Sequence, residues 1–176
     1  MIEGLIYVLA IRLLVPLLIF RWPFYGFIAA LLGDAWGDAI LLDLIGSGFG
    51  DNYHQIDKLL DLYMFTIAMI ASFKFKALER NVSIALYALR AAGILLFELT
   101  HARIFLVLFP NVFEFFFVFI TGAKKFFPKF NFTKKNAAII LIALAVPKII
   151  QEILMHQLGF DLLMWNLWLK IKELLL

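Results

Sequence analysis

The stretch IDKLLDLYMFTIAMIASFK, residues 56–74, joins a long apolar run to charged side chains near one end. A transmembrane α-helix needs about 20 mostly apolar residues, so this stretch has the length and composition of a membrane span. Asp57, Lys58 and Asp61 share one stripe of such a helix, because residues three and four apart lie on the same face. The stretch therefore predicts a membrane helix that carries charge toward a polar interior.

The rest of the chain repeats this pattern. Of its 176 residues, 64% are hydrophobic, and the mean hydropathy is +0.95. Six apolar segments are long enough to cross a bilayer: 3–20, 24–45, 56–74, 82–100, 103–121 and 137–157. We therefore expect an all-α fold, a polytopic membrane helix bundle of six transmembrane helices in a single integral membrane domain, residues 1–176.

The C-terminal stretch 160–176 is harder to assign. It is short for a span, and its polar residues do not share one face. We expect an interfacial helix with Trp165 and Trp168 at the depth of the lipid headgroups. A short seventh transmembrane helix is the alternative.

Lysine and arginine are unevenly distributed between the predicted loops. Nine of them follow the first, third and fifth segments: Arg21, Lys74, Lys76, Arg80, Lys124, Lys125, Lys129, Lys134 and Lys135. The opposite loops carry only Arg103. Because cytoplasmic loops are enriched in these residues, we expect a multi-pass cell (inner) membrane protein with cytoplasmic basic loops and an outer N-terminus. Membrane orientation explains the net charge of +3 without a nucleic acid.

Charged residues also lie inside the apolar segments. There are ten: Arg12, Asp34, Asp38, Asp57, Asp61, Arg90, Glu98, Glu114, Lys148 and Glu152. If all ten faced lipid, the cost would be roughly 25–35 kcal/mol, against a typical domain stability of about 5–15 kcal/mol. We therefore expect these groups to face one another, a ligand or water.

Prolines are a second polar signal within the segments. Three lie near the middle of predicted spans: Pro16, Pro110 and Pro147. Proline lacks an amide donor and crowds the carbonyl group four residues before it. The crowded carbonyls belong to Arg12, Leu106 and Ala143. Broken helices of this kind coordinate cations in transporters, and packing kinks are the alternative interpretation.

These features favour a transporter or channel for a proton, a small cation or a polar solute, with a network open to the outer side. The candidate binding and transport residues are Arg12, Asp34, Asp38, Asp57, Asp61, Arg90, Asn111, Glu114, Lys148 and Glu152. Seven of the ten charged residues are acids and three are bases, and Lys58 adds a fourth base. Because this leaves an excess of about three carboxylates, we expect bound protons or a monovalent cation. A closed network of ion pairs that sets helix packing is the alternative.

A metalloenzyme acting on a lipid or an outer-face substrate is the second hypothesis. Each of the three histidines has a carboxylate about one helical turn away, as in the metal sites of helix bundles. The candidate ligands for a divalent metal are His54, Asp57, Glu98, His101, Glu152 and His156. Histidines at helix ends also serve as caps or interface residues. The absence of cysteine excludes thiolate chemistry, and no catalytic motif is present, which favours a protein that is not an enzyme.

A structural or accessory subunit is the third hypothesis. In that case the charges would specify assembly as a homo-oligomer or with a membrane partner subunit. The two halves of the chain also show a weak correspondence: Arg12 and Asp34 lie 22 residues apart, and Arg90 and Asn111 lie 21 apart. Such spacing is typical of an inverted repeat, in which the two arginines would be equivalent.

Overall fold

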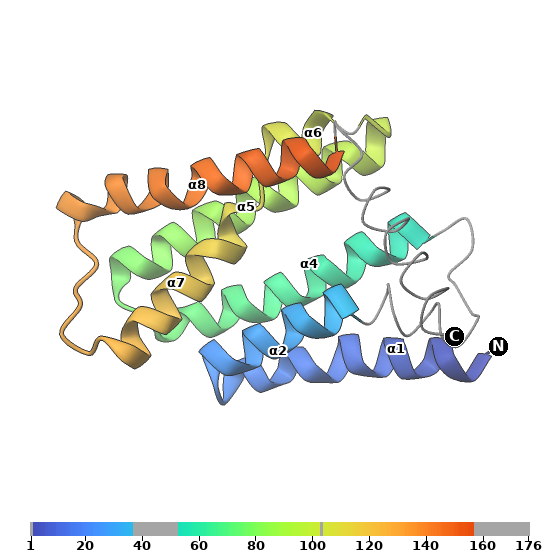
Figure 1. Cartoon of the computed structure of the whole chain (residues 1–176), viewed down its shortest axis with the longest axis horizontal. Coiled ribbons are helices and arrows are strands. Elements are labelled where there is room, and N and C mark those ends of the chain that lie inside the picture. Colours follow the sequence, from blue (N-terminus) through green and yellow to red (C-terminus); the bar gives the residue numbers. More distant parts are fainter. Residues whose placement is uncertain (1, 37–52, 103, 157–176) are drawn as a thin grey trace, which may run out of the picture.

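The computed structural model describes residues 2–36, 53–102 and 104–156, and these residues form helices and short connections without a strand (Figure 1). The elements are α1 (Ile2–Leu14), the 3₁₀ helix η1 (Val15–Phe20), α2 (Pro23–Trp36), α4 (Tyr53–Ala71), the 3₁₀ turn η4 (Ser72–Lys74), α5 (Ala77–Thr100), α6 (Ile104–Leu108), α7 (Val112–Phe126) and α8 (Lys134–His156). The all-α prediction is confirmed for these residues, and each predicted apolar segment contains a helix. The predictions for Asp38 and for 160–176 lie outside the described residues.

The helices pack as a bundle with most of their turns at its two ends. Helix α2 packs on η1, α4 packs on η1 and on α5, and α7 contacts α2, α5 and α8. The turns that follow η1, α4 and α7 lie at one end, opposite the N-terminus (Figure 1). Lys74 Nζ donates to the Phe20 carbonyl at 3.3 Å, and Lys76 Nζ donates to Asn131 Oδ1 at 2.7 Å. The basic segments therefore gather at one end of the bundle.

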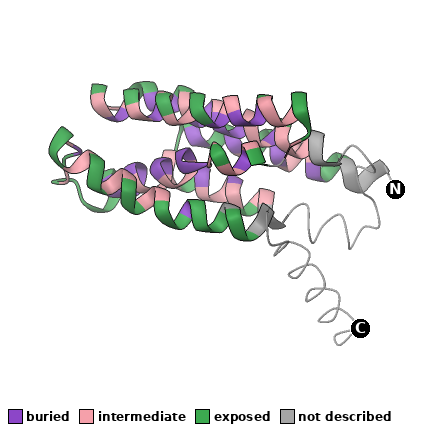
Figure 2. Cartoon of the chain, turned by 90° about the horizontal axis from the view of Figure 1, so that it is seen from above, coloured by how far each residue is buried: buried purple, intermediate pink, exposed green. Residues whose placement is uncertain are grey.

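Aromatic side chains fill the interior between α2, α4 and α7. Phe27, Phe65, Phe113 and Phe117 are at most 2% exposed. The ring centroids of Phe27 and Phe117 lie 4.7 Å apart, and those of Phe65 and Phe113 lie 5.9 Å apart. Figure 2 shows buried residues on the inward faces of the helices and exposed residues on the outward faces. This core holds the helices that carry the charged groups.

The three prolines have three different effects. After Pro16, the chain continues as the 3₁₀ helix η1. Around Pro110 the helix breaks, with α6 ending at Leu108 and α7 beginning at Val112. Helix α8 passes through Pro147 without a break. The same missing amide donor thus has a different outcome at each of the three prolines.

Two stretches of the described residues are long and apolar enough to cross a membrane: Ala77–Thr100 and Ile104–Phe126, the second spanning α6 and α7. Two such stretches are weak evidence of membrane insertion, and the prediction of six spans is not confirmed. Helix α4 has 19 residues and carries three charged residues in its first half, Asp57, Lys58 and Asp61.

Candidate functional site

Arg12 is the centre of a buried ionic cluster between α1, α2 and α4. The residue is 6% exposed. Its Nη1 donates to Asp57 Oδ1 at 2.9 Å, and its Nη2 donates to Asp61 Oδ1 at 3.0 Å. Nη2 also forms an ion pair with Asp34 on α2. A single guanidinium group therefore ties α1 to both neighbouring helices through charge-assisted contacts.

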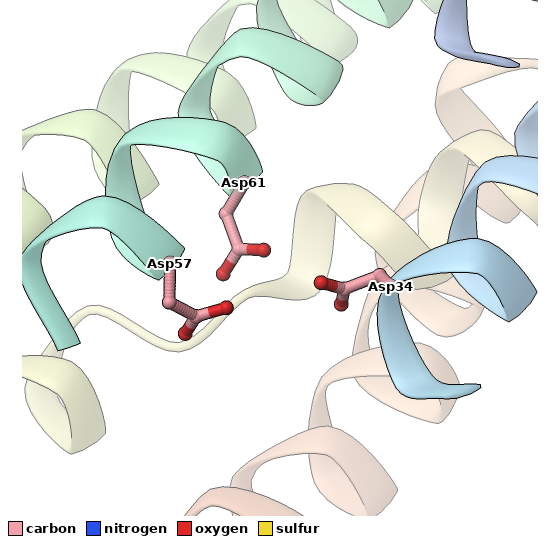
Figure 3. A group of neighbouring side chains, drawn as sticks. All are labelled: Asp34, Asp57 and Asp61. Atoms are coloured by element: carbon pink, nitrogen blue, oxygen red, sulfur yellow. The ribbon is translucent and has the colours of Figure 1, made fainter. Parts of the chain in front are cut away.

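The three carboxyl groups face the same small space. Figure 3 shows Asp57 and Asp61 on α4 directed toward Asp34 on α2. One carboxylate oxygen from each lies within 4.8 Å of the others. Three like charges this close repel one another unless cations lie between them. Arg12 provides that compensation, which explains why its own burial is tolerated.

Lys58 supplies a second cation to this cluster, although it was not among the predicted site residues. Its Nζ donates to Asp57 Oδ2 at 2.8 Å and to Asp61 Oδ2 at 3.4 Å. The sequence carried a signal for this contact, because Lys58 and Asp61 are three residues apart on one helix. The cluster thus contains three carboxylates and two cations, and it has a net charge of −1 when all are ionised.

A small cavity adjoins the cluster. Arg12 and Asp34 form its polar wall, and apolar side chains including Ile11, Leu60 and Met64 form the remainder. The cavity has room for about one water molecule. Asp34 is also the most exposed of the three carboxylates, with 31% of its side chain accessible, against 16% for Asp57 and 13% for Asp61. Access to the cluster is therefore greatest at Asp34.

Arg90 on α5 organises the break between α6 and α7. It is 4% exposed, and its Nη1 donates to the carbonyls of Phe109 at 3.3 Å and Leu106 at 3.5 Å. The Leu106 carbonyl, which Pro110 was expected to crowd, therefore accepts from a side chain of the protein itself, and the coordination of a bound cation there stays a prediction.

A third group of contacts joins α7 to α8. Glu114 Oε2 accepts from Lys148 Nζ at 3.1 Å and from Asn111 Nδ2 at 2.9 Å. Asn111 Oδ1 in turn accepts from the Glu114 amide at 3.4 Å and caps the first turn of α7. Lys148 also donates to Gln151 Oε1 at 3.1 Å. The residues predicted around Pro110 and Pro147 are thus brought together.

Eight of the ten predicted binding and transport residues fall into two groups. Arg12, Asp34, Asp57 and Asp61 form the first, and Arg90, Asn111, Glu114 and Lys148 lie in the second. Asp38 and the side chain of Glu152 lie outside the described part of the chain. With Lys58 included, the two groups together contain four acids and four bases. The predicted excess of about three carboxylates also counted Glu98, Asp38 and Glu152, so it stays a prediction.

The predicted histidine metal site stays a prediction. The side chains of His54, Glu152 and His156 lie outside the described residues. Asp57 contacts Arg12 and Lys58. Among the side chains that are described, Glu98 and His101 belong to no group of three metal ligands, whereas Asp34, Asp57 and Asp61 form one. His101 ends α5 in a left-handed conformation with φ 55°, and its amide donates to the Phe97 carbonyl at 2.7 Å.

Comparison of the chain with protein-family models, with curated proteins and with solved structures finds no match. The function must therefore be argued from the chemistry of this site. Its distinguishing feature is a buried arginine shared by three carboxylates from two helices.

Proposed function

We propose that this protein is a small multi-pass membrane protein that moves a proton or a small monovalent cation through the Arg12 cluster. The observation that carries the proposal is the sharing of one buried guanidinium by Asp34, Asp57 and Asp61. Ionisable residues inside membrane bundles mark ion and proton pathways, because their insertion is costly without a function. The exposed apolar side chains on α8, such as Ile139 and Ile142, suit contact with lipid.

The charge of the cluster suggests how it works. Arg12 and Lys58 leave one negative charge uncompensated, and a proton on one carboxylate removes it. Protonation of Asp34 weakens its ion pair with Arg12, which loosens the contact between α1 and α2. The second group has one more base than acid, because it contains two bases, Arg90 and Lys148, and a single acid. This positive charge keeps the two groups together close to neutral during the change.

The size of the cavity narrows the transported species. Space for about one water molecule suits a proton, or a bare monovalent cation, better than a larger polar solute. A divalent metal fits less well, because Arg12 already occupies the position between the three carboxylates. A metal would have to displace the guanidinium and would leave it buried without those partners.

The same proposal includes the predicted membrane arrangement. In this arrangement the basic turns lie on the cytoplasmic side and the N-terminus lies outside. The six spans would be α1 together with η1, then α2, α4 and α5, then α6 together with α7, and finally α8. The gathering of the basic segments at one end of the bundle supports this arrangement.

Proton flux into liposomes that contain the purified protein tests the proposal, with an internal pH-sensitive dye as the readout. Asp34→Asn, Asp57→Asn and Asp61→Asn should each reduce flux about tenfold or more, because an amide does not exchange the proton. Tyr87→Phe is the matched control. It removes a hydroxyl that lies 2.7 Å from Thr66 Oγ1 between α4 and α5 and leaves every carboxyl group of the network in place. Wild-type flux in all three aspartate variants would refute the proposal.

An accessory subunit is the second candidate, since the described network contains equal numbers of acids and bases. Paired charges can specify helix packing without transport. In that case flux would be absent from the wild type, and the protein would co-purify with a membrane partner or form a stable oligomer in mild detergent.

A further inference from the structure

The basic end of the bundle contains a pocket that the Arg12 cluster does not use. Its walls come from the turn before α2, the first residues of α2 and the last turn of α7, with Phe75 on one side. The cavity has a volume of about 270 Å³. This is near the lower limit of small-molecule sites, about 300 Å³, so the pocket suits a compact chemical group.

The pocket is positively charged. Arg21, Lys124 and Lys125 line it. Lys124 forms an ion pair with the buried Glu79, and its Nζ lies 4.0 Å from the centre of the Phe75 ring. One acid against three bases leaves a net charge of about +2 at the site, which favours an anion.

Two of these cations are available to a ligand in different ways. Lys125 Nζ lies 4.3 Å from the centre of the Tyr25 ring, a contact that positions the ammonium group without neutralising its charge. Arg21 is exposed, and its guanidinium offers several donors in one plane. Phosphate oxygens match that planar set of donors well.

Helix α2 adds a further attraction for an anion. Its first residues, Pro23, Phe24 and Tyr25, form part of the wall, and the helix is 14 residues long. The first amide groups of a helix have no partner within that helix and carry the positive end of its dipole. In α2 these are the amides of Phe24 and Tyr25, since Pro23 has no amide hydrogen and Gly26 N donates to the Trp22 carbonyl at 2.7 Å. A helix start beside three basic side chains is a favourable place for a phosphate group.

We propose that this pocket binds the phosphate group of an anionic lipid, with Arg21 and Lys125 as its principal ligands. The lipid source is favoured over free phosphate because Trp22 and Tyr25, 54% and 53% exposed, present amphipathic rings beside the cations. Such rings lie at headgroup depth in membranes. The lipid source rests on the proposed membrane location but does not depend on ion flux through the Arg12 cluster.

Calorimetric titration of the full chain in a neutral detergent tests this site. The probes are dihexanoyl phosphatidylglycerol, its phosphatidylcholine counterpart and inorganic phosphate. We expect saturable binding of phosphatidylglycerol. Arg21→Gln and Lys125→Gln should each weaken it about tenfold, the loss of one charge-assisted contact. Lys125→Arg, which keeps the charge, should retain most of the affinity, whereas Arg21→Lys should retain only part of it because lysine lacks the planar set of donors.

Lys135→Gln is the matched control, since Lys135 is an exposed lysine at the same end of the bundle but outside the pocket. Equal weakening by this variant and by Arg21→Gln would mean diffuse attraction to a basic surface and would overturn the site. Absence of phosphatidylglycerol binding would overturn it as well. Inorganic phosphate that binds as tightly as the lipid, with the same dependence on Arg21 and Lys125, would support the phosphate site and overturn the lipid as its source. Loss of flux in Asp34→Asn, measured separately, concerns the other proposal alone.

Discussion

The two buried arginines have comparable burial but different acceptors. Arg12 contacts carboxylates of α2 and α4, whereas Arg90 donates to the main-chain carbonyls of Leu106 and Phe109. A carboxylate can take up a proton and lose its charge, but a carbonyl cannot do so near neutral pH. The Arg12 cluster can therefore change its charge state, while the Arg90 contacts hold the broken helix in one arrangement.

The two regions also differ in net charge. The cluster around Arg12 and Lys58 has more acids than bases, and the region of Arg90, Glu114 and Lys148 has more bases than acids. When all these groups are ionised, the first region carries a net charge of −1 and the second a net charge of +1, so the two together are neutral. The comparison predicts that substitutions in the first region alter both stability and flux, whereas those in the second alter mainly stability.

Arg12→Met should have the largest effect on stability. Methionine leaves three carboxylates within 4.8 Å of one another and removes their shared cation. Loss of one partner from a buried ionic group costs about 3–5 kcal/mol. The free energy of unfolding in detergent, followed by circular dichroism, measures this loss.

Arg21→Met provides the matched control for that experiment, because Arg21 is exposed at the end of the bundle. Its free energy of unfolding should stay at the wild-type value. If Arg12→Met were equally stable, the carboxylates would not depend on the guanidinium, and the distinction between the two arginines would fail.

Gly93→Ala should have the next largest effect, and it tests the Arg90 region. A methyl group at Gly93 would lie 2.4 Å from Phe109 Cβ, so α5 could not approach the break closely enough for Arg90 to reach its carbonyls. Overpacking of this kind costs about 1–3 kcal/mol, and we expect the upper part of that range. Thermal unfolding in detergent provides the measurement.

Gly33→Ala is the corresponding change beside the Arg12 cluster. Its nearest contact would be Ile11 Cγ2 at 3.2 Å, a side-chain atom that can move. We therefore expect a smaller loss than for Gly93→Ala. The opposite order would show that the first region is the more tightly packed of the two.

The sequence predicted the positions of the helices well, because each helix corresponds to a local run of apolar residues. It also predicted that Asp57, Lys58 and Asp61 share a face, since helical geometry alone decides this. It grouped Arg12 with Asp57 and Asp61 among the binding and transport residues but did not single it out as their direct partner. Arg12 lies 45 residues from Asp57 and 49 from Asp61, and no local pattern shows which helices become neighbours.

The prolines illustrate the same limit. One rule predicted a freed carbonyl before each of them, yet the outcome depends on tertiary contacts. Only the break at Pro110 coincides, within the described residues, with an arginine that receives the carbonyls. The similar spacing in the two halves made Arg12 and Arg90 equivalent. It did not predict that Arg12 would donate to carboxylates and Arg90 to main-chain carbonyls.

Lys148→Met should produce a moderate loss of stability in the second region. It removes the cation from Glu114, but Asn111 still donates to that carboxylate and 19% of the Glu114 side chain is exposed. We expect a loss of about 1–2 kcal/mol, because the remaining partner and solvent reduce the penalty. Lys135→Met, an exposed lysine on the same helix, is the control for the chemical denaturation measurement. A loss as large as that of Arg12→Met would show that the two regions are equally dependent on their cations.

Asp34→Asn should have the smallest effect on stability. Arg12 keeps its contacts with Asp57 and Asp61, and the asparagine oxygen can still accept from the guanidinium. We expect a change of less than about 1 kcal/mol in the free energy of unfolding, within the range of a single partly exposed ionic contact. The same variant should lose proton flux, because its amide cannot take up the proton. A stable variant that does not transport would separate the function of Asp34 from its contribution to the fold. An unstable one would show that the carboxylate serves mainly to hold α2 against α1, as an accessory subunit requires.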